Sequence, residues 1–151
     1  MNKTNKMKVY STLLIFSILL LNTYIYSQTI QSTGTLTLKV TGFSNNIGQA
    51  IAKVFRKEDK IPNTPFMQVY STIENKESVI VIKNLAYGEY AIIVVHDQNS
   101  NGTIDHSWGF PSEPLGFTNN WKLGLFSGMP TFEKLKFIFS STKSFYTINV
   151  K

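Results

Sequence analysis

The chain has no cysteine among its 151 residues, so it can form neither a disulfide nor a thiolate metal site. A domain of moderate size can fold outside the cell without disulfides, and their absence therefore does not argue against export. The sequence also lacks a nucleophile elbow, an H-E-x-x-H motif and a Walker motif. The usual signatures of serine hydrolases, zinc proteases and P-loop enzymes are missing.

Concentrated positive charge is lacking as well. The formal net charge of +6 includes three lysines within the first eight residues, and the remaining 12 basic residues against 9 acidic ones give +3. These remaining lysines are scattered singly and form no basic stripe. The pattern argues against a nucleic-acid partner.

The beginning of the chain has the layout of a secretory signal peptide. A basic start precedes a mostly apolar run from Val9 to Leu21, and a polar-aromatic stretch leads to Ser27. The run is short for a membrane span, which needs about 20 residues. We predict a signal peptide at 1–27 and one domain at 28–151. The mature protein would have no stable membrane span and would be periplasmic, on the outer surface or secreted, and an uncleaved anchor is the alternative.

The body of the chain is predicted to be nearly all β. Period-two alternation and β-branched or aromatic residues predict strands at Thr35–Thr41, Gln49–Phe55, Met67–Ile73, Ser78–Leu85, Glu89–His96, Glu133–Ser140 and Phe145–Val150. The third follows prolines and suits an edge strand. The fourth is apolar on both faces and suits a central strand. The last two are expected to pair across the turn at 141–143, and no later stretch has a helical period.

The segment from Leu85 to Tyr90 has the L-x-x-G-x-Y form of a tyrosine corner, in which the tyrosine bonds back to the backbone. An ordinary glycine turn before a core tyrosine is the alternative. Many short strands without helices predict an all-β fold, a single antiparallel Greek-key β-sandwich of transthyretin-like or immunoglobulin-like type with one long ordered loop.

A run of oxygen-bearing side chains follows the predicted strand that ends at His96. Asp97, Asn99 and Asn101 occupy positions 1, 3 and 5 of a calcium loop, Gly102 occupies position 6, and Asp105 occupies position 9. Calcium binds six to eight hard oxygen ligands, and alternate residues of a tight loop present their side chains inward. The sequence therefore predicts a Ca²⁺ site that also uses the Thr103 backbone carbonyl.

The match to a calcium loop is incomplete. Position 12, where an EF-hand has a bidentate glutamate, is Trp108, and the preceding segment is a strand. Glu113 is the nearest later carboxylate and could complete the ligand set if the chain curls back. With two neutral asparagines among the leading ligands, the expected affinity is weak, about 10⁻⁴ to 10⁻³ M. The alternative is an Asx-rich turn that binds no metal.

The connection from Asp97 to Thr131 is far longer than loops of compact domains usually are. Its aromatic content argues for order, since disordered segments have few aromatic residues. We expect these side chains to form a satellite core under the loop. Alternatively they are exposed and bind a sugar or a peptide. The aromatic residues are Trp108, Phe110, Phe117, Trp121 and Phe126.

Three motifs in order resemble the exported bacterial family catalogued as domain of unknown function 2141. The resemblance covers nearly the whole mature chain and implies a small extracytoplasmic β-domain, similar to transthyretin-like and carboxypeptidase-regulatory-like sandwiches, with no assigned activity. It also places Glu113 in a shared motif. The motifs are Leu85-x-x-Gly88-x-Tyr90-Ala91, His96-Asp97-x-Asn99-x-Asn101-Gly102-x-x-Asp105 and Gly109-x-Pro111-x-Glu113-x-x-Gly116-Phe117-x-Asn119-Asn120.

Three functions remain open. The leading interpretation is a non-catalytic exported module whose calcium ion braces the long aromatic loop as a recognition surface for an extracytoplasmic ligand or protein. The second is a carbohydrate- or peptide-binding module that uses the loop aromatics without metal, with His96, Trp108, Phe110, Phe117 and Trp121 as candidate contacts. The third is a hydrolase, because His96, Asp97, Asp105, His106 and Glu113 are close in sequence and paired carboxylates can act as acid and base.

Overall fold

The computed structural model describes residues 32–124 and 126–151. The predicted signal peptide at 1–27 lies outside the described residues. Residues Ser32–Lys151 form one compact unit that contains all the elements and both hydrophobic clusters described below. Among the described helices, none is long and apolar enough to cross a membrane.

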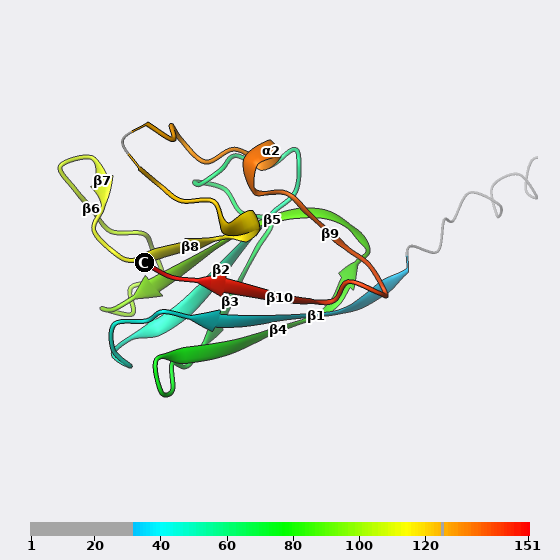
Figure 1. Cartoon of the computed structure of the whole chain (residues 1–151), viewed down its shortest axis with the longest axis horizontal. Helices are drawn as coiled ribbons and strands as arrows, with labels where there is room; N and C mark the ends of the chain where they lie inside the picture. The colour runs from blue at the N-terminus through cyan, green and yellow to red at the C-terminus, as the bar shows by residue number, and fades with distance from the viewer. Residues whose placement is uncertain (1–31, 125) are drawn as a thin grey trace, which may run out of the picture. The chain divides into compact units, whose positions relative to one another are not determined.

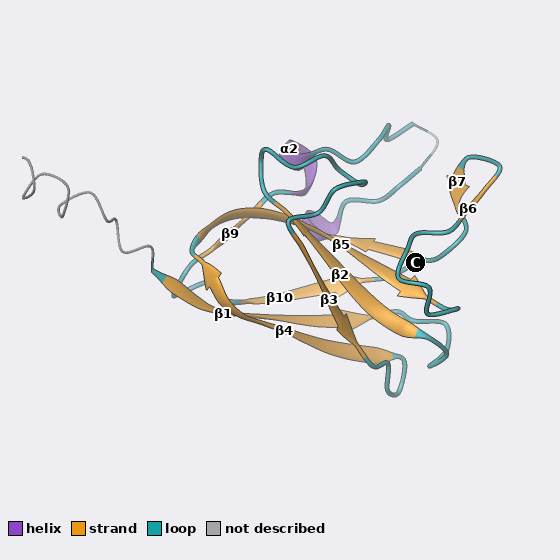
Figure 2. Ribbon diagram, turned by 180° about the vertical axis from the view of Figure 1, so that it is seen from behind, coloured by secondary structure: helices purple, strands orange, loops and turns teal. Residues whose placement is uncertain are grey.

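Two sheets form the body of the unit (Figures 1 and 2). One has the strand order β10-β1-β4, and the other has the order β3-β2-β5-β8, with β9 also paired to β5. A separate hairpin joins β6 to β7. The elements are β1 (Thr33–Thr41), β2 (Gln49–Phe55), β3 (Met67–Ser71), β4 (Glu77–Ala86), β5 (Gly88–Asp97), β6 (His106–Ser107), β7 (Phe110–Pro111), β8 (Leu115–Phe117), the 3₁₀ turn η1 (Thr118–Asn120), α2 (Phe132–Leu135), β9 (Phe137–Phe139) and β10 (Phe145–Asn149).

The all-β sandwich-like fold is confirmed, because strands dominate and the alternation read from the sequence matches the burial. In β1, Leu36, Leu38 and Val40 are fully buried and their neighbours are not. They pack in a large cluster that includes the inward residues of β2, β4 and β5. Burial of such side chains contributes roughly 1.5–3 kcal/mol each, so this cluster is the main source of stability.

A second, smaller cluster covers the opposite face of β2 and β5. It combines Phe55, Ala91 and Ile93 of these strands with Phe117, Phe132 and Leu135. The strands β2 and β5 are therefore buried on both faces, which explains why their sequences are apolar almost throughout. Part of the long connection thus forms the expected satellite core.

The prediction that Ser78–Leu85 is a central strand is wrong. The strand β4 lies at the edge of the three-stranded sheet, and its outward Val79 and Val81 are 58% and 43% exposed. Their β-branched side chains suit a pleated surface even where one face is in water, and the run therefore looks buried on both faces when only its hydrophobicity is read.

The predicted pairing of the last two strands is also wrong. The strand β10 runs parallel to β1, with Leu38 opposite Tyr146, and β9 is antiparallel to β5. The predicted strand Glu133–Ser140 begins as the single helical turn α2, because a turn of helix directs Phe132 and Leu135 together into the smaller cluster.

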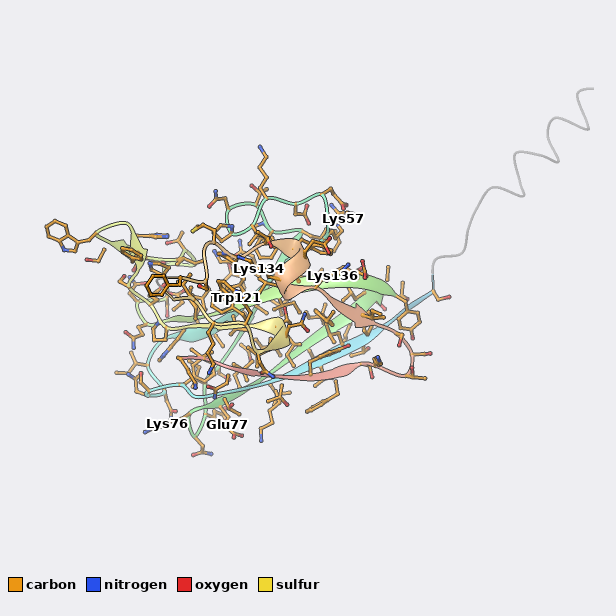
Figure 3. All side chains as sticks on the ribbon, turned by 45° about the horizontal axis from the view of Figure 1, so that its top comes forward. Lys57, Lys76, Glu77, Trp121, Lys134 and Lys136 are labelled. Atoms are coloured by element: carbon orange, nitrogen blue, oxygen red, sulfur yellow. The ribbon has the colours of Figure 1, made fainter. Side chains whose placement is uncertain are left out.

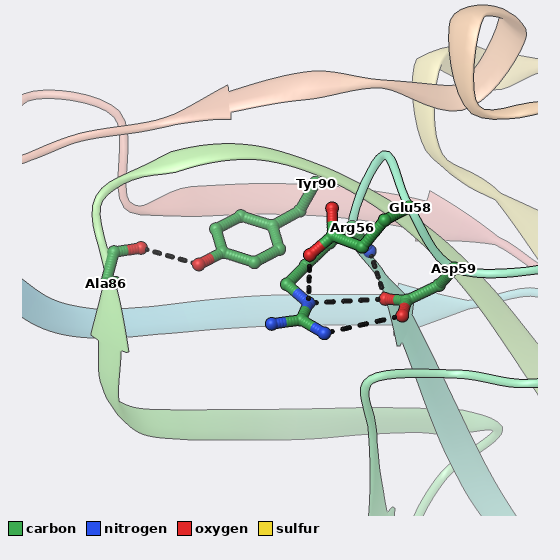
Figure 4. Close-up of polar contacts among 5 residues, drawn as sticks. All are labelled: Arg56, Glu58, Asp59, Ala86 and Tyr90. Atoms are coloured by element: carbon green, nitrogen blue, oxygen red, sulfur yellow. Dashed lines mark hydrogen bonds and ion pairs between the residues drawn. The ribbon is translucent and has the colours of Figure 1, made fainter.

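The tyrosine corner is present at the start of β5. The Tyr90 hydroxyl donates a hydrogen bond to the Ala86 carbonyl oxygen over 2.9 Å (Figure 4). Close by, the Arg56 guanidinium pairs with Glu58 and Asp59, at 3.1 and 3.4 Å. The bond fixes the bend between β4 and β5 and buries the ring in the larger cluster.

The tyrosine corner predicts a loss of stability in alkali. Burial raises the pKa of the Tyr90 phenol, and of two smaller effects the Arg56 charge lowers this pKa and the Glu58 charge raises it. A raised pKa in the folded chain means that the neutral phenol contributes stability below about pH 10, which is lost as the pH rises through the folded-state value. In urea unfolding, the free energy of unfolding of Tyr90→Phe should change less between pH 8 and pH 11 than that of the wild type. At pH 8 the substitution should lower this free energy by about 1 kcal/mol. Tyr70→Phe, at an exposed tyrosine, should change neither the free energy of unfolding at pH 8 nor its dependence on pH. If Tyr90→Phe keeps the pH dependence of the wild type, the assignment is wrong.

Candidate functional site

The polar loop begins at the last residue of β5. Asp97 lies opposite Gln49 in the β2–β5 ladder and is fully buried. The Gln49 Nε2 donates to Asp97 Oδ2 over 2.8 Å. The strand pairing therefore fixes this carboxylate at the point where the chain leaves the sheet.

The Asp97 carboxylate organises the first turn of the loop. Its Oδ1 accepts from the Asn101 backbone N–H over 3.1 Å, and its Oδ2 accepts from the Gly102 N–H over 2.9 Å. Gly102 has φ +80°, a conformation that glycine adopts at little cost, and it lets the chain fold back over the carboxylate. The motif glycine thus has the local role expected of it.

Asn99 and Asn101 also accept hydrogen bonds from backbone N–H groups of the loop. Asn99 Oδ1 accepts from the Asn101 N–H over 3.1 Å, and Asn101 Oδ1 accepts from the Thr103 N–H over 2.8 Å. Their side-chain amides both point at Asp105, with Asn99 Nδ2 2.7 Å from Oδ2 and Asn101 Nδ2 2.9 Å from Oδ1. The Thr103 hydroxyl donates to Asn101 Oδ1 over 2.8 Å. These are the Asx turns named as the alternative to a metal site, and they join Asn99, Asn101 and Asp105 by side-chain hydrogen bonds.

Glu113 returns to the loop from beyond the β6–β7 hairpin. It is 8% exposed, its Oε1 accepts from the Gln98 N–H over 3.1 Å and its Oε2 accepts from the Asp105 N–H over 3.2 Å. The chain therefore curls back as the sequence required. The hairpin between Asp105 and Glu113 is the insertion that places this acid at position 17 instead of 12.

The negative charges of the site have no direct ion-pair partner among the described residues. Among the described residues, none of the carboxylates of Asp97, Asp105 and Glu113 forms an ion pair with a lysine or arginine. Burial opposes ionisation of Asp97, but hydrogen bonds from Gln49 and three backbone N–H groups outweigh it and keep the pKa of this carboxyl low. It is therefore charged at neutral pH.

One buried lysine lies within the field of these acids. Lys53 on β2 is 7% exposed. Burial lowers the pKa of its ammonium group, while the negative charges of Asp97 and Glu113 oppose that shift. Sequence reasoning missed both Lys53 and Gln49, because each is an isolated polar residue in a strand and only the β2–β5 register reveals the neighbour it serves.

The donor set fits a hard cation such as calcium by its chemistry. In the described part of the chain, no three His, Cys, Asp or Glu side chains converge closely enough to hold a metal by themselves. A complete shell would need amide oxygens and the Thr103 carbonyl besides the carboxylates. As the hydrogen-bond network places them, Asn99 Oδ1 and Asn101 Oδ1 accept from backbone N–H groups, so each amide would have to give up that bond to turn its oxygen toward an ion beside Asp105.

The candidate histidines lie apart from each other. His96 is fully buried, with its Nε2 2.9 Å from the Ile47 carbonyl oxygen and its ring edge-on to Phe43 at 5.1 Å. His106 lies exposed on β6. His96 and Asp97 are neighbours on β5 and face opposite sides of the sheet, because alternate residues of a strand do so.

The loop aromatics divide into two groups. Phe117 is buried in the smaller cluster and meets Trp121 edge-on at 4.8 Å, as expected of a satellite core. Trp108, Phe110 and Phe126 are 98%, 64% and 101% exposed, so the prediction that all loop aromatics pack under the loop is wrong for these three. Trp108 and Phe126 lie in turns, and Phe110 lies on the two-residue strand β7.

Comparison with known proteins gives one family. A family model described as an uncharacterized protein conserved in bacteria, domain of unknown function 2141, matches residues 38–146. Neither curated proteins nor solved structures gave a match. The resemblance to transthyretin-like domains is therefore not confirmed.

Proposed function

The chain belongs to this uncharacterized bacterial family, and we propose that it is an exported, non-catalytic module that binds calcium in the loop after β5. Asp97, Asn99, Asn101 and Asp105 would offer side-chain oxygens, with Glu113 and the Thr103 carbonyl completing the set. The observation that supports this best is the return of Glu113, with its carboxylate, to the same loop as the two aspartates. A divalent cation would offset their negative charge.

The ion would act as a brace. It would link the end of β5 to residues on both sides of the β6–β7 hairpin, because Asp105 precedes the hairpin and Glu113 follows it. Each end is held by hydrogen bonds from backbone N–H groups, which contribute only about 1 kcal/mol each. Calcium would therefore stiffen the base of the hairpin and the loop that it begins.

A non-catalytic role is supported by the positions of the would-be acid and base groups. The His96 ring is enclosed in the core and its Nε2 is occupied by the Ile47 carbonyl. Asp97 and Glu113 are buried and their oxygens accept from N–H groups of the loop. A general base needs hydrogen-bond reach to a substrate proton, which these positions do not offer.

Calcium should raise the melting temperature of residues Ser32–Lys151. For a dissociation constant of about 10⁻⁴ to 10⁻³ M, 10 mM calcium stabilises the folded state by about 1.4–2.7 kcal/mol. For a domain of this size the corresponding rise is roughly 5–10 °C. Calorimetric titration should give heat with one site, and Asp105→Asn should abolish both the heat and the rise.

A matched control separates loss of a ligand from loss of charge. Glu133→Gln removes one negative charge from an exposed side chain in α2 and should keep the full response to calcium. Melting in EDTA should give similar values for both variants, since among the described residues the Asp105 side chain is bonded only by two side-chain amides, and its backbone bonds to Glu113 and Ser112 are kept. A wild-type domain that shows neither heat nor a rise would remove calcium from the function.

A further inference from the structure

Lys53 is a buried cation for which the calcium proposal has no role. It lies in the middle of β2, and its neighbours on the same face of the strand, Ile51 and Phe55, are fully buried. Lys57 and Lys76, in contrast, are exposed in turns at the surface (Figure 3). Lysine is almost never buried without a partner, yet within the described structure Lys53 forms no ion pair. Its position therefore requires negative charge that acts from a longer distance.

The strand register places Lys53 on the same face of the sheet as the acids of the loop. Alternate residues of β2 share a face, so the side chains of Gln49 and Lys53 point to the same side. Gln49 lies opposite Asp97 and donates to its carboxylate. Four residues of a strand span about 13 Å, and the long lysine side chain can cover part of that distance.

Glu113 joins the same face from the segment before β8. The β5–β8 ladder extends beyond β8, because the His96 N–H donates to the Pro114 carbonyl oxygen over 3.0 Å. The next pair in this register is Asp97 opposite Glu113. Directly opposite side chains of an antiparallel pair are close neighbours. The two buried acids are therefore adjacent on the face that carries Lys53.

The charges of the two acids act on Lys53. Burial lowers the pKa of its ammonium group, and the negative charges of Asp97 and Glu113 oppose that shift. Buried charges interact over longer distances than exposed ones, because less water and salt screens them. Lys122 and Lys151 line a cleft together with Glu113, but both are exposed, so their charges are screened. Lys53 is the buried cation of this site.

We propose that Lys53 is the internal counter-ion of Asp97 and Glu113, and that its positive charge lowers the affinity of the loop for calcium. The second part rests on the proposed function. The lysine offsets part of the negative charge that the fold brings together, and it would repel a calcium ion held by the same acids. Weak calcium binding is then a property of β2 as well as of the loop.

Calorimetric titration of residues 32–151, which form one compact unit, compares Lys53→Met with the wild type. Methionine is flexible and suits a buried position, so the variant should fold. Its affinity for calcium should be higher by at least about fivefold, a typical size for coupling between two sites. Lys57→Met removes the same charge from an exposed turn beyond the other end of β2 and should bind calcium as the wild type does (Figure 3). Equal affinities of Lys53→Met and the wild type would overturn the proposed effect on calcium while leaving calcium binding itself in place.

A measurement in EDTA tests the counter-ion without calcium. The pKa of the Lys53 ammonium group is followed by NMR of its Nζ in the wild type and in Glu113→Gln. Loss of the Glu113 charge should lower this pKa, because a nearby negative charge favours the ammonium form. Glu133→Gln, at an exposed acid of α2, should leave it unchanged.

The two measurements separate the counter-ion from the proposed function. A Lys53 pKa that is the same in Glu113→Gln and the wild type would overturn the counter-ion, whatever the calcium titration gives. If the wild type gives no heat with calcium but Glu113→Gln lowers the Lys53 pKa, the proposed function is wrong and the counter-ion is supported.

Discussion

Replacing Gly48 by alanine should lower the free energy of unfolding by about 4 kcal/mol. This is the sum of two effects, the strain of a positive φ in alanine and the overlap of its Cβ with neighbouring atoms. Gly48 has φ +79°, and a Cβ there would lie 2.0 Å from the Asp97 carbonyl oxygen and 2.6 Å from the Gln98 Cα. Both are backbone atoms at the start of the polar loop, so neither can move without shifting the end of β5. Urea unfolding gives the free energy directly.

Gly109→Ala is the matched control for Gly48→Ala. Gly109 has almost the same φ, +81°, but no atom lies within 4 Å of the Cβ position. It should therefore carry the conformational cost alone, about 1 kcal/mol. Equal losses in the two variants would show that the close approach of Gly48 to β5 adds nothing to stability.

Asp97→Ala should cost about 3 kcal/mol, whether or not calcium binds. It leaves the Gln49 amide and the Gly102 N–H without their acceptor, while the Asn101 N–H keeps Asn99 Oδ1, and Asp97 itself is fully buried. Each buried donor without a partner costs about 1–3 kcal/mol, partly relieved by water entering at the loop. Asp105→Ala should cost under about 1 kcal/mol, because within the described structure the carboxylate that it removes accepts only from the exposed side-chain amides of Asn99 and Asn101.

The pH dependence of the same variant checks the assignment. The low pKa of Asp97 in the folded chain means that its contribution is present above the unfolded value near 3.9 and is lost as the pH falls through the folded value. Between pH 5 and pH 2, the free energy of unfolding should therefore fall more steeply with falling pH in the wild type than in Asp97→Ala. Parallel curves would mean that the carboxylate is not held in its charged form by these bonds.

Much of the fold could be predicted from local sequence. The bounds of β2 match the prediction, and those of β1 and β5 differ by at most two residues, because alternation and turn residues mark strand ends directly. The positions of strands within the sheets could not be read in the same way. The edge position of β4 and the parallel pairing of β10 with β1 depend on contacts between residues far apart in the chain.

The same limit applies to the candidate site. The spacing from Asp97 to Asp105 indicated a loop that closes on itself, and Glu113 was identified as the acid that could return. The contribution of Lys53 and Gln49 depends on the β2–β5 register, which no local pattern contains. The exposure of Trp108 could not be predicted either, because the local sequence of a hairpin turn does not show whether another segment covers its aromatic side chain.

The parallel pairing of β1 with β10 has a consequence for the order of folding. On one side residues 37–41 pair with residues 77–81 of β4, but on the other side they pair with residues 145–149, and Val150 then continues beside Gly116 of the other sheet. A nascent chain must therefore be almost completely synthesised before its first strand is enclosed. Until then β1 presents a bare edge, and closing so large a loop is slow compared with forming a hairpin.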